Sequence, residues 1–283
     1  MIRMKDFKKP VTLFIAIPLF CASCTYSRTT ADLSLAPEFV SKTYYDYTKN
    51  PVNSEMFYIS DGYSNSMTLD DAFGCTWYES QVNTNAEEGM SLKVEKTDDI
   101  SLIKDAERNP APQLEPYLGA EIRTNEAFTY GFFDCYMKVA KGNGLVTAFF
   151  TYTGPSENQP HDEIDFEFLG KDTTQVQFNY FSGNDVAHEC YYRLGFDASE
   201  DYHHYGFYWG LHEITWYVDF VPIYRVADIE APKNPCKVFN SLWSVNSHSR
   251  GMVQWAKKVN DADLPSKAYV KDISIAPLPT PEN

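Results

Sequence analysis

Basic residues are scarce in this sequence. Its 283 residues include 24 Lys and Arg against 39 Asp and Glu, which gives a formal net charge of −15. A protein that binds nucleic acid needs a positive face for the phosphates, so this balance argues against DNA or RNA as a partner. An uncharged ligand suits such a surface better than an anionic one.

Several other patterns are missing as well. The sequence has no C-x-x-C pair and no His-rich tract, so nothing in it suggests a zinc or haem site. No long window keeps a 3.6-residue period, so helices should be short and few. There is no internal repeat. The composition, 43% hydrophobic and 16% aromatic, excludes disorder over most of the length and is enough for one sizeable core.

The N-terminal residues read as a targeting segment. Four basic residues precede the apolar run VTLFIAIPLFCA, which is shorter than the roughly 20 residues of a membrane-spanning helix. We expect residues 1–23 to be a signal peptide. Small residues directly before Cys24 resemble a bacterial lipoprotein cleavage site, although Cys21 stands where an aliphatic residue is usual. Lipidation at Cys24 is favoured over plain secretion, and both imply export, to the outer membrane or cell surface if a lipid anchor is present.

Short alternations of apolar and polar residues dominate the rest of the chain and predict strands. They fall at 90–96, 120–125, 131–140, 145–153, 175–181, 213–220 and 269–276. Many short strands at a regular spacing predict an all-β fold, an antiparallel β-sandwich of the jelly-roll type. We expect a tether at 24–43, one domain at 44–277 and a disordered tail at 278–283. The proline-containing segment Asp98–Tyr117 is expected to be a long loop of undetermined role.

The stretch HDEIDFEFLG carries the strongest chemical signal. Side chains alternate in a strand, so Glu163, Asp165 and Glu167 share one face while the apolar residues between them face the core. Carboxylates this close oppose one another's ionisation, so at least one should hold its proton to unusually high pH. A protonated acid beside an ionised carboxylate is what glycosidic bond cleavage requires. A plain solvated sheet face would more often mix charges of both signs.

We call Glu163, Asp165 and Glu167 the acid ladder. The acid ladder and its flanks resemble glycoside hydrolase family 16, in particular the bacterial lichenases, which cut β-1,3-1,4-glucan. The matching segments, in order along nearly the whole expected domain, are DGYSN (61–65), CTW (75–77), AEIR (120–123), FFTYTGP (149–155), DEIDFEFLGKDTTQVQFNY (162–180), LGFDAS (194–199), ITWYVD (214–219) and LW (242–243).

This resemblance implies a role for each acid. Glu163 would be the nucleophile, Asp165 its electrostatic helper and Glu167 the general acid/base. The implied reaction retains the anomeric configuration, which places the two outer carboxyls about 5–5.5 Å apart. Because four residues of a flat strand span about 13 Å, the sheet must be curved, concanavalin-like, with the acids lining a concave cleft.

The resemblance also implies a sugar-binding surface and a metal site. The substrate-binding positions are Tyr63, Asn65, Glu121, Arg123, Phe150, Tyr152, Asn179 and Trp243. Without the family match, Glu121 and Arg123 could equally be a structural ion pair. Structural calcium would be bound by the backbone carbonyls of Tyr47 and Gly89 and the side chain of Asp272. Catalysis itself is expected to need no cofactor, and the protein is expected to be a monomer.

The sequence departs from the lichenase pattern at several positions. His161 replaces a tryptophan, and HDEIDFEFLG is instead typical of plant xyloglucan endotransglycosylases and hydrolases of the same family. His161 is therefore a further substrate-binding candidate. Ser241 replaces an asparagine. Gly119 replaces the usual disulfide partner of Cys75, so any bridge must be a substitute, for example Cys75–Cys135; free thiols are an equally good expectation for the four cysteines of the domain.

The preferred hypothesis is a retaining endo-hydrolase that cleaves β-1,4 bonds in mixed-linkage β-glucan. One alternative is a xyloglucan-active hydrolase or transglycosylase, which His161 and Phe166 favour. Another is a lectin-like glucan-binding protein without activity, against which the complete acid ladder argues.

Overall fold

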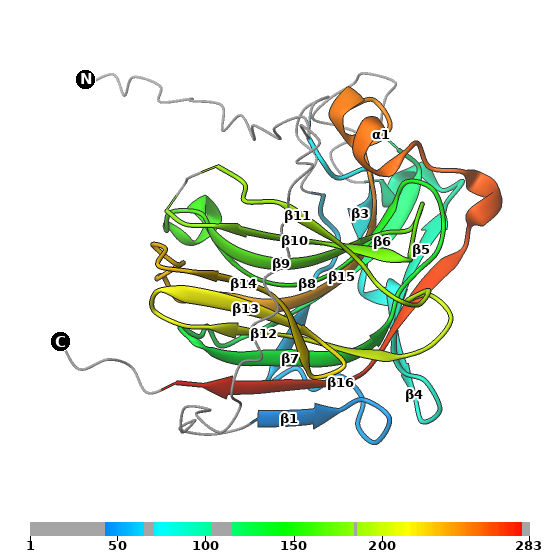
Figure 1. Cartoon of the computed structure of the whole chain (residues 1–283). Coiled ribbons are helices and arrows are strands. Elements are labelled where there is room, and N and C mark those ends of the chain that lie inside the picture. Colours follow the sequence, from blue (N-terminus) through cyan, green and yellow to red (C-terminus); the bar gives the residue numbers. More distant parts are fainter. Residues whose placement is uncertain (1–42, 65–70, 104–114, 184–185, 279–283) are drawn as a thin grey trace, which may run out of the picture.

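The computed structural model describes residues 43–64, 71–103, 115–183 and 186–278 (Figure 1). The predicted signal peptide, Cys24, the tether before residue 43, Asn65, most of the loop after Ile103 and the last five residues lie outside these ranges. Strands run from Thr43 to Pro277 within the described part. No helix of the described residues is long and apolar enough to cross a membrane.

Two packed sheets make up the domain. The first, in spatial order, consists of β11 (Cys190–Arg193), β10 (Gln175–Phe181), β9 (Asp162–Leu169), β8 (Leu145–Thr153), β15 (Lys237–Ser244), β6 (Tyr117–Thr124) and β2 (Phe57–Ile59). The second consists of β5 (Gly89–Lys96), β16 (Ser266–Pro277), β7 (Gly131–Lys138), β12 (His203–Trp209), β13 (Glu213–Val218) and β14 (Val221–Ala227), with β1 (Thr43–Asp46) on β16 and β4 (Val82–Asn85) on β5.

The two sheets are continuous at one corner. There β5 pairs with β6 over two residues, and the short β3 (Thr76–Trp77) runs parallel to β6, whereas the other pairings are antiparallel. Helices are short: α1 (Arg250–Ala256) and single 3-10 turns at Glu79–Gln81, Ile100–Leu102, Pro155–Glu157 and Asp261–Asp263. Figure 1 shows the two sheets as curved layers that lie one over the other. The prediction of a curved antiparallel β-sandwich is confirmed.

Aromatic side chains fill the space between the sheets. Phe166 of β9 lies 5.7 Å and Phe168 4.7 Å, between ring centroids, from Tyr205 of β12. Phe178 of β10 lies 5.6 Å from Trp216 of β13. All five side chains are fully buried, and burial of each such ring stabilises the fold by about 2–3 kcal/mol. The apolar half of the acid ladder is therefore what fixes β9 in the core.

Of the two alternatives that the sequence leaves open, free thiols and a substitute bridge such as Cys75–Cys135, the structure shows free thiols. Cys75, Cys135, Cys190 and Cys236 are all buried free thiols. Cys75 packs against Gly119 in β6, where a side chain built on the glycine would meet the sulfur at 2.6 Å. Cys135 faces the core from β7 beside Asn240, whose Nδ2 is 4.0 Å from its sulfur.

Candidate active site

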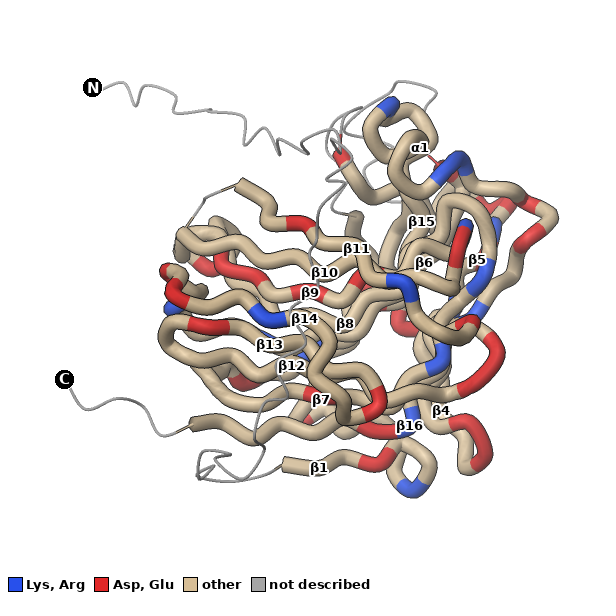
Figure 2. Tube along the Cα trace, viewed as in Figure 1, with Lys and Arg blue, Asp and Glu red and all other residues tan. Residues whose placement is uncertain are grey.

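Strand β9 presents its three acids on the side of the first sheet that faces away from the core. Asp165 is 3% exposed, and Glu163 and Glu167 are each partly exposed. Acidic positions recur along β9 in Figure 2. Cross-strand register then determines the neighbours of each acid, because directly paired residues project to the same face. Asp165 pairs with Asn179 of β10 and Phe150 of β8.

The electrostatics of the ladder separate its carboxyls. Burial, followed by repulsion from Glu163, raises the pKa of Glu167 to about 8, and Glu189 adds to this effect. Burial, then Glu163 and Glu167, raises the pKa of Asp165 well above its usual range, while a hydrogen bond from Asn179 opposes the rise. At neutral pH Glu167 therefore keeps its proton, as the sequence pattern predicts for at least one acid of the ladder.

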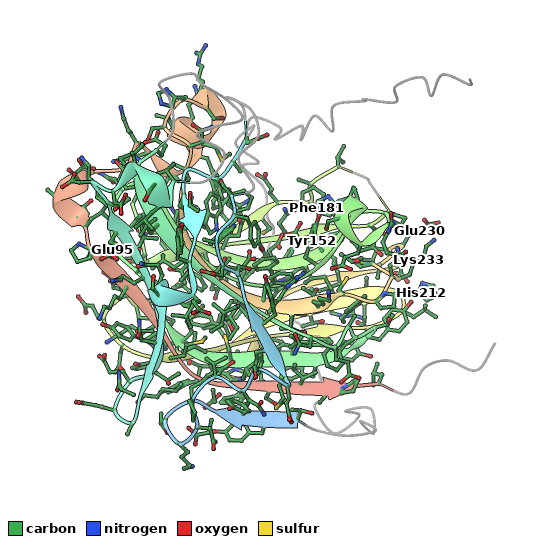
Figure 3. The ribbon with its side chains drawn as sticks, turned by 180° about the vertical axis from the view of Figure 1, so that it is seen from behind. Glu95, Tyr152, Phe181, His212, Glu230 and Lys233 are labelled. Carbon is green, nitrogen blue, oxygen red and sulfur yellow. The ribbon has the colours of Figure 1, made fainter. Side chains whose placement is uncertain are left out.

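His161 contacts Glu163 directly. Its Nε2 lies 2.5 Å from Glu163 Oε2. An ionised Glu163 can only accept, so in that state the Nε2 atom of His161 carries the proton and donates it. The imidazole stacks on Phe181 with centroids 4.3 Å apart and planes 20° apart. The Tyr152 ring meets it edge-on, with centroids 5.4 Å apart. Figure 3 shows Tyr152 and Phe181 in the same part of the molecule. These two rings hold the imidazole against Glu163.

Aromatic residues continue this surface across β8 and β15. Phe150 stacks on Phe239 with centroids 4.7 Å apart and planes 14° apart, and Tyr152 meets Phe239 edge-on at 6.2 Å. Burial and the nearby Glu163 raise the pKa of Tyr152 to about 12, so its hydroxyl is a neutral donor. Flat rings beside hydroxyl donors suit the apolar faces and polar edges of sugars.

Glu121 and Arg123 follow on β6 but do not form the simple ion pair considered from the sequence. Glu121 is buried and accepts hydrogen bonds from Ser60 Oγ at 2.6 Å and from the Tyr63 hydroxyl at 3.3 Å. Arg123 instead lies 3.4 Å from Glu157. It also stacks over the exposed ring of Tyr58, 4.9 Å from the centroid.

Trp243 occupies a more enclosed position than a sugar-stacking role suggests. It is 5% exposed, with Phe73 at 4.6 Å and Trp255 of the α1 helix at 6.0 Å between ring centroids. Trp255 Nε1 donates to Gln177 Oε1 over 2.6 Å, and Gln177 pairs with Glu167 in the sheet. Little of the Trp243 ring is open to a ligand.

Four residues that sequence reasoning missed belong to this face. Phe181 and Phe239 contact His161 and Phe150. Glu189, half-buried just before β11, has a pKa raised by burial, and its charge acts on Glu167. Tyr191 pairs with Gln177 in the register of β10 and β11. Alternation within β10 could have identified Phe181, but the other three depend on which strands become neighbours.

The three residues predicted to bind calcium, Tyr47, Gly89 and Asp272, all lie next to Lys271. The Tyr47 N–H donates to the Lys271 carbonyl over 2.8 Å, and a side chain on Gly89 would come within 2.9 Å of the Lys271 Cα. Asp272 is the next residue. Within the described ranges, no group of three or more His, Cys, Asp or Glu side chains is placed to hold a metal ion.

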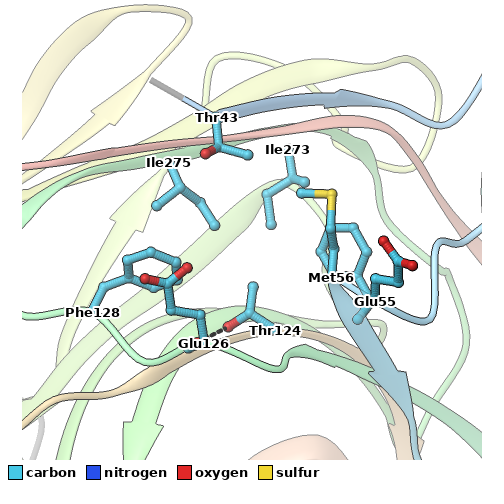
Figure 4. A pocket seen from close by; sticks show the side chains of 9 residues that line it. Thr43, Glu55, Met56, Thr124, Glu126, Phe128, Ile273 and Ile275 are labelled. Carbon is cyan, nitrogen blue, oxygen red and sulfur yellow. Dashed lines mark hydrogen bonds between the residues drawn. The ribbon is translucent and has the colours of Figure 1, made fainter. Parts of the chain in front are cut away.

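A small cavity of about 120 Å³ lies elsewhere, between β1 and β16 on one side and β2 and β6 on the other (Figure 4). Apolar side chains such as Phe128 and Ile275 line it, with Glu55 and Glu126 among its polar residues. It includes none of the residues of the acid face.

Known proteins resemble this chain in sequence. The model of glycosyl hydrolases family 16 matches residues 69–261. A xylanase/beta-glucanase of Ruminococcus flavefaciens is 42% identical over 191 residues, which are 66% of this chain and 22% of that protein. The chain thus spans about a fifth of that relative's length. A beta-glucanase of Bacillus amyloliquefaciens is 37% identical over 211 residues, covering 75% of this chain and 78% of the relative.

Solved structures agree. A prokaryotic beta-1,3-1,4-glucanase (lichenase) from a mouse hindgut metagenome superposes with a TM-score of 0.71 at 33% identity, covering 84% of this chain and 100% of the other. The beta-glucanase of Bacillus licheniformis gives 0.70 at 34% identity, covering 83% and 97%. The residues that the family model matches include the whole acid ladder and strands of both sheets. The chain is a glycoside hydrolase and belongs to glycosyl hydrolases family 16.

Proposed function

We propose that this chain is a retaining endo-glucanase that cleaves β-1,4 bonds in mixed-linkage β-1,3-1,4-glucan. The observation that carries the proposal is that the two outer glutamates of the acid ladder have different surroundings. Glu167 holds a proton at neutral pH, while Glu163 accepts a hydrogen bond from His161. Relatives named beta-glucanase and lichenase support the choice of polymer.

In the first step Glu163 attacks the anomeric carbon. A bond forms between its carboxylate oxygen and that carbon while the glycosidic C–O bond breaks, and the proton of Glu167 passes to the leaving oxygen. In the second step Glu167, now ionised, takes a proton from water. The resulting attack on the anomeric carbon releases Glu163 as a carboxylate and restores the acid.

Asp165 supports both steps from between the two glutamates. It hydrogen-bonds Glu163, and its carboxyl is also held by Asn179. The Nδ2 of Asn179 donates to Asp165 because its Oδ1 is already occupied by the His188 N–H at 2.8 Å. This arrangement fixes the position of Asp165 while leaving Glu163 oriented by His161.

Product analysis tests the proposal. Purified protein is incubated with lichenan, xyloglucan and laminarin, and the oligosaccharides and the initial anomer are identified. We expect lichenan to be cut internally with retention, and Glu163→Ala and Glu167→Ala to lose this activity. Tight glucan binding without new reducing ends would favour the lectin-like alternative instead.

Xyloglucan is the second candidate substrate, because His161 stands where lichenases carry a larger tryptophan. The imidazole leans on Phe181 and Glu163, so the space beside the cleavage point differs from one filled by an indole. Cleavage or transfer on xyloglucan faster than on lichenan would select this alternative.

Structural calcium is a further part of the proposal, with the carbonyls of Tyr47 and Gly89 and the side chain of Asp272 as ligands. Burial, followed by the neighbouring Asp134, raises the pKa of Asp272, although the Tyr44 hydroxyl counters this by donating to it. A cation there would relieve this cost, and oxygen donors suit calcium. Calcium should raise the Tm relative to EGTA in the wild type but not in Asp272→Asn.

We also propose that the protein is exported, that a lipid on Cys24 anchors it, and that it is a monomer. The basic and apolar N-terminal sequence supports export. Expressed in a bacterial host, the full chain should enter the membrane fraction, and Cys24→Ala should shift it to the soluble exported fraction. Sedimentation of the mature domain should give a monomer.

A further inference from the structure

Phe220 is exposed in an unusual place. It lies in the hairpin turn between β13 and β14 and is 67% exposed. Asp219 has φ 48° and Phe220 has φ 63°, so both central residues of the turn are left-handed. Asn-Gly or Asp-Gly pairs favour such a turn, whereas a bulky side chain is strained there. Strained backbone that carries an exposed aromatic ring points to a binding role.

The Phe220 ring covers a buried histidine. It stacks on His204 of β12 with centroids 3.7 Å apart and planes 20° apart. His204 is 3% exposed, and neither ring nitrogen has a hydrogen-bond partner among the described residues. Nε2 lies 3.2 Å from Asp134 Oδ1, but without hydrogen-bond alignment.

A glycine makes room for two more rings beside this pair. A side chain on Gly206 would meet Phe132 at 3.1 Å, so its absence lets Phe132 lie across β12. Phe132 comes within 6.4 Å of His204, nearly parallel to it, and within 5.4 Å of Tyr217, edge-on. These rings, with Phe220, form a continuous aromatic surface, which we call the outer patch, on the side of the second sheet that faces away from the core.

The outer patch has a polar floor. Ser274 of β16 pairs with Asp134 of β7, which in turn pairs with Gly206, so the two polar side chains lie in one row under the rings. Both are buried, and Ser274 Oγ has no hydrogen-bond partner in the described part of the chain. Tyr44 of β1 extends the row on its exposed side.

We propose that the outer patch is a second, non-catalytic binding surface for a neutral β-glucan chain. Flat rings stack on the apolar faces of sugars, and the 67% exposed ring of Phe220 offers such a face. The identity of the glucan rests on the proposed function. The patch lies on the sheet opposite the acid ladder, so a polymer held there leaves the active face free.

A charged lipid surface fits less well. An anionic lipid surface would be repelled by Asp134 and by the net charge of −15. A neutral polyol meets no such repulsion.

The test replaces Phe220 by glycine, the residue that a left-handed turn prefers. Phe220→Gly should fold at least as stably as the parent, which separates binding from folding. The matched control is Leu211→Ser. Leu211 is 51% exposed in the turn between β12 and β13, at the other end of the hairpin. Both changes are made in the wild type and in a Glu163→Gln background, where the polymer is not consumed.

Retention in native gels that contain lichenan measures binding by the Glu163→Gln proteins. Phe220→Gly should weaken retention about threefold to tenfold, the range for one lost aromatic contact, while Leu211→Ser leaves it unchanged. Rates on a short soluble oligosaccharide should stay the same in the wild-type background.

Two results would overturn the inference: equal retention with and without Phe220→Gly, or a loss that Leu211→Ser reproduces. Sedimentation showing that Phe220→Gly dissolves a dimer would assign the patch to a second copy instead. Hydrolysis of lichenan by the wild type is scored separately. If it fails while Phe220-dependent retention persists, the proposed function falls and the outer patch stands; the reverse pattern removes only the patch.

Discussion

The indole nitrogen of Trp216 donates a hydrogen bond to the backbone carbonyl of Asp165 over 3.0 Å. Trp216 belongs to β13 in the second sheet and Asp165 to the acid ladder in the first, so this bond ties the reactive strand to the far side of the core. Trp216 also stacks on Phe178 of β10, the strand next to β9. The position of the acid ladder is therefore fixed by packing against the second sheet as well as by pairing of β9 with β8 and β10 in the first.

Trp216→Phe should test this connection. It removes the donor and leaves a void, which should lower the free energy of unfolding by about 1–3 kcal/mol. Because Asp165 would lose one of its fixed points, kcat on lichenan should fall more than KM rises. Chemical denaturation and steady-state kinetics measure the two effects. Reduced stability with an unchanged kcat would show that the bond supports the fold alone.

The pH dependence of both activity and stability should follow Glu167. Its pKa is raised to about 8, so the proton needed by the leaving group is present below that pH and lost above it. The alkaline limb of the rate profile should therefore lie near pH 8. Glu167→Gln should abolish this limb and lower kcat by about 10²–10⁴-fold, the usual contribution of a general acid.

The stability of the fold should also decrease as the pH rises. A carboxyl whose pKa is raised by folding binds its proton more tightly in the native state, so its contribution is complete at acid pH and is lost as pH rises from the ordinary value toward about 8. Thermal unfolding of the wild type should weaken across this window. Glu167→Gln should flatten part of the decline, whereas Glu126→Gln, a control away from the ladder, should not.

His161 should position Glu163 rather than merely line the cleft. His161→Ala removes the donor at 2.5 Å, and loss of a hydrogen bond to a charged group should lower kcat about tenfold to hundredfold. His161→Gln, which keeps an N–H donor, should recover part of this loss. If Ala and Gln variants lose activity equally, the ring serves packing against Phe181 alone.

Much of this site could be predicted from the sequence because strands alternate. Period two placed the three acids on one face, and the apolar residues between them in the core, before any neighbour was known. What alternation cannot supply is which strands lie side by side. Phe239 and Glu189 reach the acid face only through the register of β15 and the path into β11.

Trp243, by contrast, was predicted as a substrate-binding residue but is covered in the structure. Its strand position agrees with a cleft-facing ring, but Phe73 and Trp255 arrive from distant parts of the chain and cover it. Likewise, His161 looked like a sugar-binding residue from its place in the motif. Its contact with Glu163 depends on the rotamer that Phe181 and Tyr152 impose, which no linear pattern encodes.

Gly119 offers a test of the packing behind the ladder, since its missing side chain leaves space for Cys75. A Cβ at position 119 would lie 2.6 Å from the Cys75 sulfur and 3.3 Å from its Cβ. Gly119→Ala should therefore overpack the core and lower the free energy of unfolding by about 1–3 kcal/mol. Gly119→Cys places two sulfurs close to disulfide geometry, for which Cβ atoms lie about 3.5–4.5 Å apart.

After oxidation Gly119→Cys should contain one disulfide by mass spectrometry and gain about 2–4 kcal/mol over its own reduced form. Comparison with the reduced form matters, because the reduced variant carries the same overpacking as Gly119→Ala. Activity on lichenan should persist, since Cys75 lies in the core and contacts none of the acids. Two free thiols after oxidation would mean that the strands β3 and β6 cannot separate by the few tenths of an ångström that the bond requires.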